Sequence, residues 1–111
     1  MANKYGARKT LIDGVLFDSM KEASFYQQLL LEKRAGNIID FELQPKFILQ
    51  EGFIVDDKKI RAITYTADFL VFHGGYKEII DVKGMQTEVF RLKWKMLMHK
   101  LSGQGYRFSI V

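Results

Sequence analysis

The chain has 111 residues, of which 48% are hydrophobic and 14% aromatic, and this composition fits one folded domain and argues against disorder. It contains no cysteine, which excludes disulfides and thiolate metal sites and agrees with a reducing cytoplasm. The formal charge of +4 and the pI of about 9.3 favour a nucleic-acid partner.

Residues 1–16 are expected to form a basic N-terminal arm, with a turn at Asp13-Gly14-Val15. The arm lacks the apolar run of a signal peptide, and no apolar stretch long enough to span a membrane follows, so we expect a cytoplasmic location. The arm would either follow a phosphate backbone or exchange between subunits. A disordered tail is the simpler alternative.

A helix is predicted over residues 19–35. Ser19 and Glu22 form a capping box, and Gly36-Asn37 supplies the stop. One broad face of this helix collects Ala23, Phe25, Tyr26, Leu29 and Leu30. Glu22 and Lys33 fall near the middle of that face. A capping acid need not face the core, so the position of Glu22 favours a further role.

Strands are predicted over 38–50 with a break at Pro45, then over 53–55, 60–72 and 76–83, with a polar turn at 56–59. A second helix over 88–102 follows the cap Thr87, and 106–111 forms a last strand. The chain shows no repeat or linker. The element order therefore predicts a single α/β domain over 1–111, with a mixed central sheet flanked by two helices.

The Gly74-Gly75 pair predicts a two-residue type I′ turn, because glycine accepts the positive φ that this turn requires. Counting outward from the turn sets Asp68 directly opposite Asp81, and alternation puts Lys83 on the same face as Asp81. Two carboxylates facing each other in apolar strands repel. Either one must bind a proton or a cation must compensate both.

This arrangement suits a hard divalent cation, because Mg²⁺ prefers oxygen ligands and needs only one or two carboxylates beside its waters. Asp68, Asp81 and the backbone carbonyl of Val82 are the expected ligands, with Lys83 orienting the attacking water. Mn²⁺ is expected to substitute for Mg²⁺. The alternative is an edge strand whose acids face water and are neutralised by Lys83. The two other Asp-x-Lys triplets lie in the polar turn at 56–59 and are interpreted as solvated charges.

Taken together, these features resemble the PD-(D/E)xK nuclease superfamily, with its αβββαβ restriction-endonuclease-like core. The segments that carry the closer resemblance are FDSMKEASFYQQLL, FELQPKFIL, YTADFLVF and DVKG. They are similar to a family of small phage and prophage proteins that is itself similar to Holliday-junction resolvases and transposon end-cleaving endonucleases. The resemblance runs from about residue 17 to residue 100.

The resemblance implies that Asp68 and Asp81 bind the metal, that Lys83 is the catalytic lysine, and that Glu22 completes the metal site. Two positions depart from the family pattern. Ala67 replaces a proline that carries no chemistry, and Asp81 is shorter than the glutamate common at its position, which would shift the metal slightly.

Basic residues of the second helix, Arg91, Lys93 and Lys95, are the expected phosphate contacts, because the helix carries only positive charge after Glu88. A plain solvated helix face is the alternative. Lys46 is expected to add to this surface. Gln44 either reaches the active site or satisfies backbone groups at the strand break. The histidines are assigned no metal, and Trp94 is expected in the core.

We therefore expect a Mg²⁺-dependent DNA endonuclease of a bacterial host cell, of phage or prophage origin, that acts on branched or junction DNA in recombination or DNA processing. Cutting both strands would require a homodimer. No membrane and no small-molecule cofactor is expected. The competing interpretations are a non-catalytic DNA-binding module that kept the nuclease fold, and a structural protein with an incidental acid cluster.

Overall fold

The computed structural model describes residues 9–111. Its first elements are the strands β1 (Thr10–Ile12) and β2 (Val15–Phe17), which form a hairpin around the predicted turn. Asp13 and Gly14 have φ values of 52° and 78° in that turn. Phe17 is buried in the core beside the first helix. The described part of the expected arm is thus mostly a packed hairpin, and residues 1–8 lie outside the described residues.

Helix α1 (Met20–Ala35) begins and ends where the sequence predicts. The Ser19 Oγ accepts a hydrogen bond from the Glu22 N–H at 3.1 Å, and Gly36 ends the helix with a φ of 80°. The helix buries Glu22, Ala23, Tyr26 and Leu29. The predicted position of Lys33 on the apolar face of the helix is wrong, because its side chain is half exposed and its Nζ lies 2.9 Å from Asp40 Oδ1.

One long, interrupted antiparallel ribbon follows α1. It consists of β3 (Asp40–Leu43) with β8 (Phe69–Phe72), β4 (Lys46–Gln50) with β7 (Ile63–Thr66), and β5 (Phe53–Val55) with β6 (Lys58–Ile60). The single strand predicted over 60–72 is therefore wrong. One interruption, at residues 61–62, lies next to a bulge between Ile48 and Gln50, and the other faces the confirmed break at Pro45.

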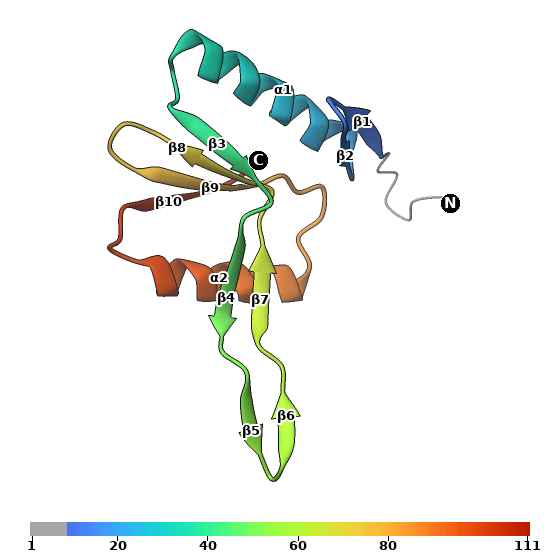
Figure 1. The fold of residues 1–111 in the computed structure, drawn as a ribbon, viewed down its shortest axis with the longest axis vertical. Coiled ribbons are helices and arrows are strands. Elements are labelled where there is room, and N and C mark those ends of the chain that lie inside the picture. The colour runs from blue at the N-terminus through green and yellow to red at the C-terminus, as the bar shows by residue number, and fades with distance from the viewer. Residues whose placement is uncertain (1–8) are drawn as a thin grey trace.

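The central sheet has four strands in the order β10-β9-β8-β3. Strand β9 (Lys77–Asp81) is antiparallel to β8, and β10 (Tyr106–Ile110) is parallel to β9, so the sheet is mixed as predicted. Helix α1 covers one face and α2 (Glu88–Leu101), capped by Thr87, covers the other (Figure 1). Over residues 9–111, the structure thus confirms a mixed α/β fold with two helices.

The core has two halves, one on each side of this sheet. Phe69, Val71, Ile80 and Val82 pack toward α1, whereas Leu70 and Ile79 pack toward α2. Trp94 lies in the α2-side half, as predicted, where it contacts the rings of Tyr65, Phe90 and Phe108.

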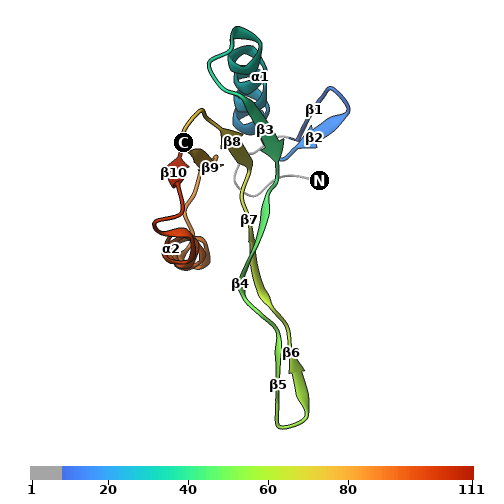
Figure 2. The ribbon, with the colours of Figure 1, turned by 60° about the vertical axis from the view of Figure 1, so that its left-hand side comes forward.

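The central sheet and the two helices form the body of the molecule. The outer part of the ribbon, which consists of β4 with β7 and β5 with β6, projects from this body as an arm. Strands β5 and β6 form its tip and continue the line of β4 and β7 (Figure 2). The molecule measures 53 Å along its longest axis and only 24 Å along its shortest. Within residues 9–111, no helix has the length and apolar character needed to cross a bilayer.

Candidate active site

The break between β7 and β8 decides which face of the sheet Asp68 takes. Ala67 and Leu70 both pack in the α2-side core, three positions apart, whereas Phe69 packs on the α1 side. Regular alternation would put Ala67 and Leu70 on opposite faces. The chain therefore turns at Asp68, and its carboxyl group lies close enough to Glu22 of α1 to perturb that residue's pKa.

The predicted hairpin register is confirmed, but two details of the prediction are wrong. His73 N–H donates to the Tyr76 carbonyl at 2.9 Å, and Phe69 pairs with Ile80. Neither central glycine of the turn, however, lies in the left-handed region that a type I′ turn requires. The ladder also ends at the pair Phe69–Ile80, because the chain turns at Asp68, so Asp68 and Asp81 are not paired across the strands as predicted.

Asp81 and Lys83 lie on the α2 side of the sheet end. Their neighbours Ile80 and Val82 pack toward α1, so alternation directs the acid and the lysine to the other face, as predicted. Lys83 Nζ is 3.1 Å from Asp81 Oδ1 and 4.6 Å from the centre of the Phe90 ring. Asp81 is only 1% exposed.

A backbone contact links the two sides of this end of the sheet. Asp68 Oδ2 accepts a hydrogen bond from the Val82 N–H at 2.6 Å. The Val82 N–H belongs to the peptide bond that follows Asp81, so Asp68 contacts the backbone directly beside the second acid. Lys83 also lies near enough to lower the pKa of both Asp68 and Asp81. The four predicted residues Glu22, Asp68, Asp81 and Lys83 are thus gathered at the same end of the sheet.

All three acids of this group hold protons more tightly than usual. Burial, followed by the neighbouring charges of Asp68 and Asp18, raises the pKa of Glu22 to about 7. Burial also raises the pKa of Asp68, although the hydrogen bond from the Val82 N–H and the charge of Lys83 lower it in part. Burial likewise raises the pKa of Asp81, although Lys83 lowers it in part. The local electrostatics therefore favour protonation or a compensating cation.

The residues present fit a hydrated divalent cation in their chemistry. Asp81 Oδ1 is buried and lies 3.1 Å from Lys83 Nζ, and the acids supply the oxygen ligands that Mg²⁺ prefers. Within residues 9–111, no three His, Cys, Asp or Glu side chains are arranged as a complete metal site. One or two carboxylates suffice for Mg²⁺ when waters fill its remaining positions.

Sequence reasoning missed two residues next to this group. The charge of Asp18, just before the cap of α1, raises the pKa of both Glu22 and Asp68. Lys21 Nζ donates to the Lys83 carbonyl at 3.5 Å, which ties the first turn of α1 to the end of β9. The available signal was their position beside Glu22 in the sequence DSMKE.

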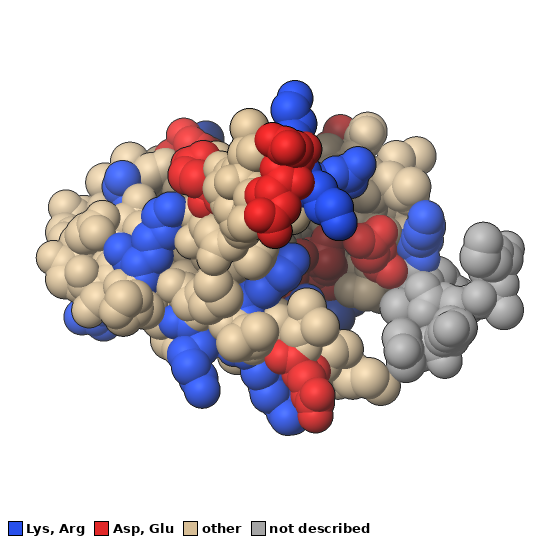
Figure 3. Space-filling view, turned by 90° about the horizontal axis from the view of Figure 1, so that it is seen from below, with Lys and Arg blue, Asp and Glu red and all other residues tan. Residues whose placement is uncertain are grey.

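The expected DNA contacts divide into two groups. Arg91, Lys95 and Lys46 are exposed, as a phosphate contact requires. Lys93 instead donates to the Thr64 carbonyl at 2.9 Å and so joins α2 to β7. Viewed from the tip of the arm, Lys and Arg atoms spread across the surface between several groups of Asp and Glu atoms, one of which lies in a recess (Figure 3).

Gln44 contributes to the site through its backbone. It is exposed and has a φ of 50°, and its N–H donates to the Asp68 carbonyl at 2.9 Å. Of the two interpretations of Gln44, this geometry favours the one in which the residue satisfies backbone groups at the break.

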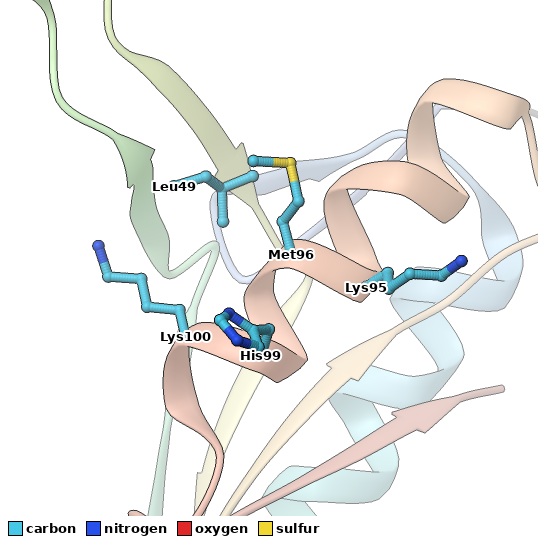
Figure 4. Close-up of a pocket in the computed structure, with 5 residues that line it drawn as sticks. All are labelled: Leu49, Lys95, Met96, His99 and Lys100. Atoms are coloured by element: carbon cyan, nitrogen blue, oxygen red, sulfur yellow. The ribbon is translucent and has the colours of Figure 1, made fainter.

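A shallow groove lies between α2 and the base of the arm. It is lined by Leu49, Lys95, Met96, His99 and Lys100 (Figure 4). Leu49 and Met96 meet across the groove, while Lys95 and Lys100 point away from each other. Lys100 Nζ donates to the Ile48 carbonyl, so this lysine fastens the helix to the arm.

Comparisons with curated proteins and with solved structures find no match. A comparison with family models matches residues 2–109, which is almost the whole chain. The chain therefore belongs to the family described as Protein of unknown function (DUF1064).

Proposed function

We propose that this protein is a divalent-metal-dependent DNA endonuclease of the PD-(D/E)xK type. The observation that carries the proposal is the burial of Asp81, a carboxyl group that is only 1% exposed and whose Oδ1 lies 3.1 Å from Lys83 Nζ at the end of the sheet. A buried acid beside a lysine, with further acids close by, is costly for a purely structural protein and suits a metal-dependent site. The acids Glu22 and Asp68 arrive at the same end of the sheet.

The order of the elements supports the same proposal. Along the chain, the parts of the central sheet and its two helices appear as α1, β3, β8, β9, α2 and β10. This is the αβββαβ order of the nuclease core that the sequence resembles. The ribbon β4–β7 and its tip are then an insertion between the first and second core strands.

In this proposal, Asp68 and Asp81 hold the cation, and Glu22 completes the site from α1. A bound Mg²⁺ would lower the pKa of a water and offset negative charge on the phosphate. Lys83 would donate to the attacking water or to a phosphate oxygen, since 30% of its side chain remains exposed. Glu22 has a pKa of about 7 without metal, so it must lose its proton to hold the cation.

The substrate we propose is branched or junction DNA, in recombination or DNA processing of phage or prophage origin inside a bacterial cell. Arg91, Lys95 and Lys46 supply exposed positive charge for the phosphate backbone. Contacts with phosphates position a protein on DNA without reading base sequence, so this surface fits recognition of DNA shape.

The test is cleavage of supercoiled plasmid, linear duplex, single-stranded DNA and a four-way junction in Mg²⁺ or Mn²⁺. We expect cleavage by the wild type, its loss in EDTA, and a loss of at least ~100-fold in Asp68→Asn and in Asp81→Asn. Asp57→Asn, an exposed acid at the tip of the arm, is the matched control and should cut normally. Equal cleavage by all three variants would refute the proposal.

The alternative function is a DNA-binding module without catalysis, which the exposed basic residues alone would support. The same variants separate the two cases. A nuclease variant that lacks an acid still binds junction DNA in EDTA, as tightly as the wild type or more tightly, because a negative charge has been removed. A binding module shows this affinity but never cuts in any metal.

A further inference from the structure

The tip of the arm exposes an unusual amount of apolar surface for a two-stranded sheet. Ile54 is 69% exposed, Phe53 and Val55 are each 47% exposed, and Ile60 is 37% exposed. All six residues of β5 and β6 are exposed. An isolated hairpin is at best marginally stable in water, and such a surface gains stability when another element covers it.

The two edges of this hairpin differ in how they are protected. Strand β6 carries Lys58 and Lys59, and charged residues of this kind, lysine above all, prevent edge-to-edge pairing in natural sheets. Strand β5 has the sequence Phe-Ile-Val, with no charge, proline or bulge. The edge of β5 is therefore open to pairing, whereas that of β6 is not.

The register shows which backbone groups point outward from β5. Val55 pairs with Lys58 across a two-residue turn of Asp56 and Asp57, whose φ values are 48° and 61°. The pair that closes such a turn is hydrogen-bonded, and hydrogen-bonded pairs alternate along an antiparallel ladder. The N–H and carbonyl of Ile54 therefore point away from β6, toward the outer edge.

We propose that β5 pairs antiparallel with β5 of a second copy of this chain, about a two-fold axis at Ile54. The two arms would then form one four-stranded sheet with the β5 strands at its centre. Ile54 would exchange backbone hydrogen bonds with the partner's Ile54, and Phe53 would lie opposite the partner's Val55. A strand that pairs with itself makes a closed, isologous contact, which ends at the dimer.

Charge favours this partner and this edge. Lys58 and Lys59 stay on the outer strands, whereas pairing through β6 would set Lys59 against the partner's Lys59. Gly52 lies against the backbone of Ile60–Ala62 and would stand opposite the partner's Asp56. Because Gly52 has no side chain, the neighbouring Arg61 can reach across it toward that aspartate.

The contact is short, so we expect a weak dimer. Stable complexes bury about 1,600 Å² in total, and two three-residue strands with their neighbours cover less than that. Dimer formation should therefore depend on protein concentration in the micromolar range or above.

Cysteine cross-linking tests the geometry, because the chain has no cysteine of its own. In the proposed register, Ile54→Cys places two cysteines opposite each other, within reach of a disulfide. We expect this variant to form a covalent dimer under mild oxidation at least ~10-fold faster than Lys59→Cys, which tests the protected edge. Equal rates for the two variants would overturn the proposal.

Sedimentation velocity of the full chain provides the second measurement. We expect the wild type to shift from monomer toward dimer as its concentration rises, and Ile54→Lys to stay monomeric. Leu31→Lys, at a leucine 59% exposed on α1, is the matched control and should dimerise like the wild type. A monomeric wild type at every concentration would contradict the proposal. Neither measurement needs DNA or metal, so failure here would leave the proposed nuclease activity standing.

Discussion

At the scale of single residues, Asp81 and Lys83 form an unequal pair. The acid is almost fully buried, whereas the lysine side chain keeps 30% of its surface exposed. Lys83 therefore reduces the cost of the buried acid while its ammonium group can still meet a substrate. The site depends on this pair for stability and, in the proposed reaction, for the position of the attacking water.

This pair makes a prediction about stability. Lys83→Met should lower the free energy of unfolding by roughly 1–3 kcal/mol, because it leaves Asp81 buried without its cation. Adding Asp81→Asn should recover much of that loss. Urea unfolding of both single variants and the double variant, in EDTA at neutral pH, measures the coupling. Strictly additive effects would show that the two side chains do not interact.

Glu22 predicts how stability depends on pH. Its pKa is about 7 in the folded chain and near 4.5 when unfolded, so between these values the folded state binds more protons. Without metal, stability should therefore fall as pH rises from about 4.5 to about 7, and this contribution should level off above that.

Glu22→Gln checks this interpretation. It keeps the Ser19 cap on the backbone N–H and removes the charge, so the slope between about pH 5 and pH 7 should become shallower. Asp68 and Asp81 should leave some slope, because their pKa values are also raised. Urea unfolding in EDTA across this range is the measurement. An unchanged slope would mean that Glu22 is ionised throughout.

At the scale of elements, the kink in the ribbon is what builds the site. Gln44 and Pro45 on one strand face Ala67 and Asp68 on the other, and the chain turns at both. Without this kink, Asp68 would follow Leu70 onto the α2 side and lose its contact with Glu22. The kink thus brings Asp68 close to Glu22 of α1.

The backbone role of Gln44 is testable by Gln44→Gly. Glycine adopts a positive φ without strain, so stability should stay within about 0.5 kcal/mol of the wild type or rise. Thr66→Gly, at an extended position of β7, should instead lose about 1 kcal/mol. Cleavage should survive in Gln44→Gly. A stable variant that no longer cuts would show that the side chain reaches the substrate.

Local signals in the sequence were sufficient for much of the fold. The caps Ser19 and Thr87, the break at Pro45 and the pairing set by the two-residue turn all depend on neighbours in the chain, and all were predicted. The turn type was not, because its backbone conformation is not the only one that two glycines allow.

The missed features depend on tertiary contacts. The face taken by Asp68 follows from a break that only the pairing with Gln44 and Pro45 reveals. Asp18 and Lys21 join the site because the first turn of α1 lies beside the end of β9, and in the sequence only their position beside Glu22 pointed to this. Helix periodicity predicts Lys93 as a phosphate contact, because it cannot reveal the hydrogen bond from Lys93 to the backbone of β7.

At the scale of the whole molecule, the body and the arm have different tasks in this account. The body gathers the acids where the central sheet, α1 and the kinked ribbon meet, and α2 presents Arg91 and Lys95 to the solvent. The arm extends beyond this body, and its open β5 edge suits a second copy (Figure 2). Two active sites in a dimer would allow both DNA strands to be cut.

The most direct test of this account is a calorimetric titration of Mn²⁺ into the protein without DNA. We predict saturable binding by the wild type, a loss of that binding in Asp81→Asn, and no effect of Asp57→Asn at the tip of the arm. Identical, non-saturating heats for the wild type and Asp81→Asn would contradict the central claim that these acids hold a divalent cation.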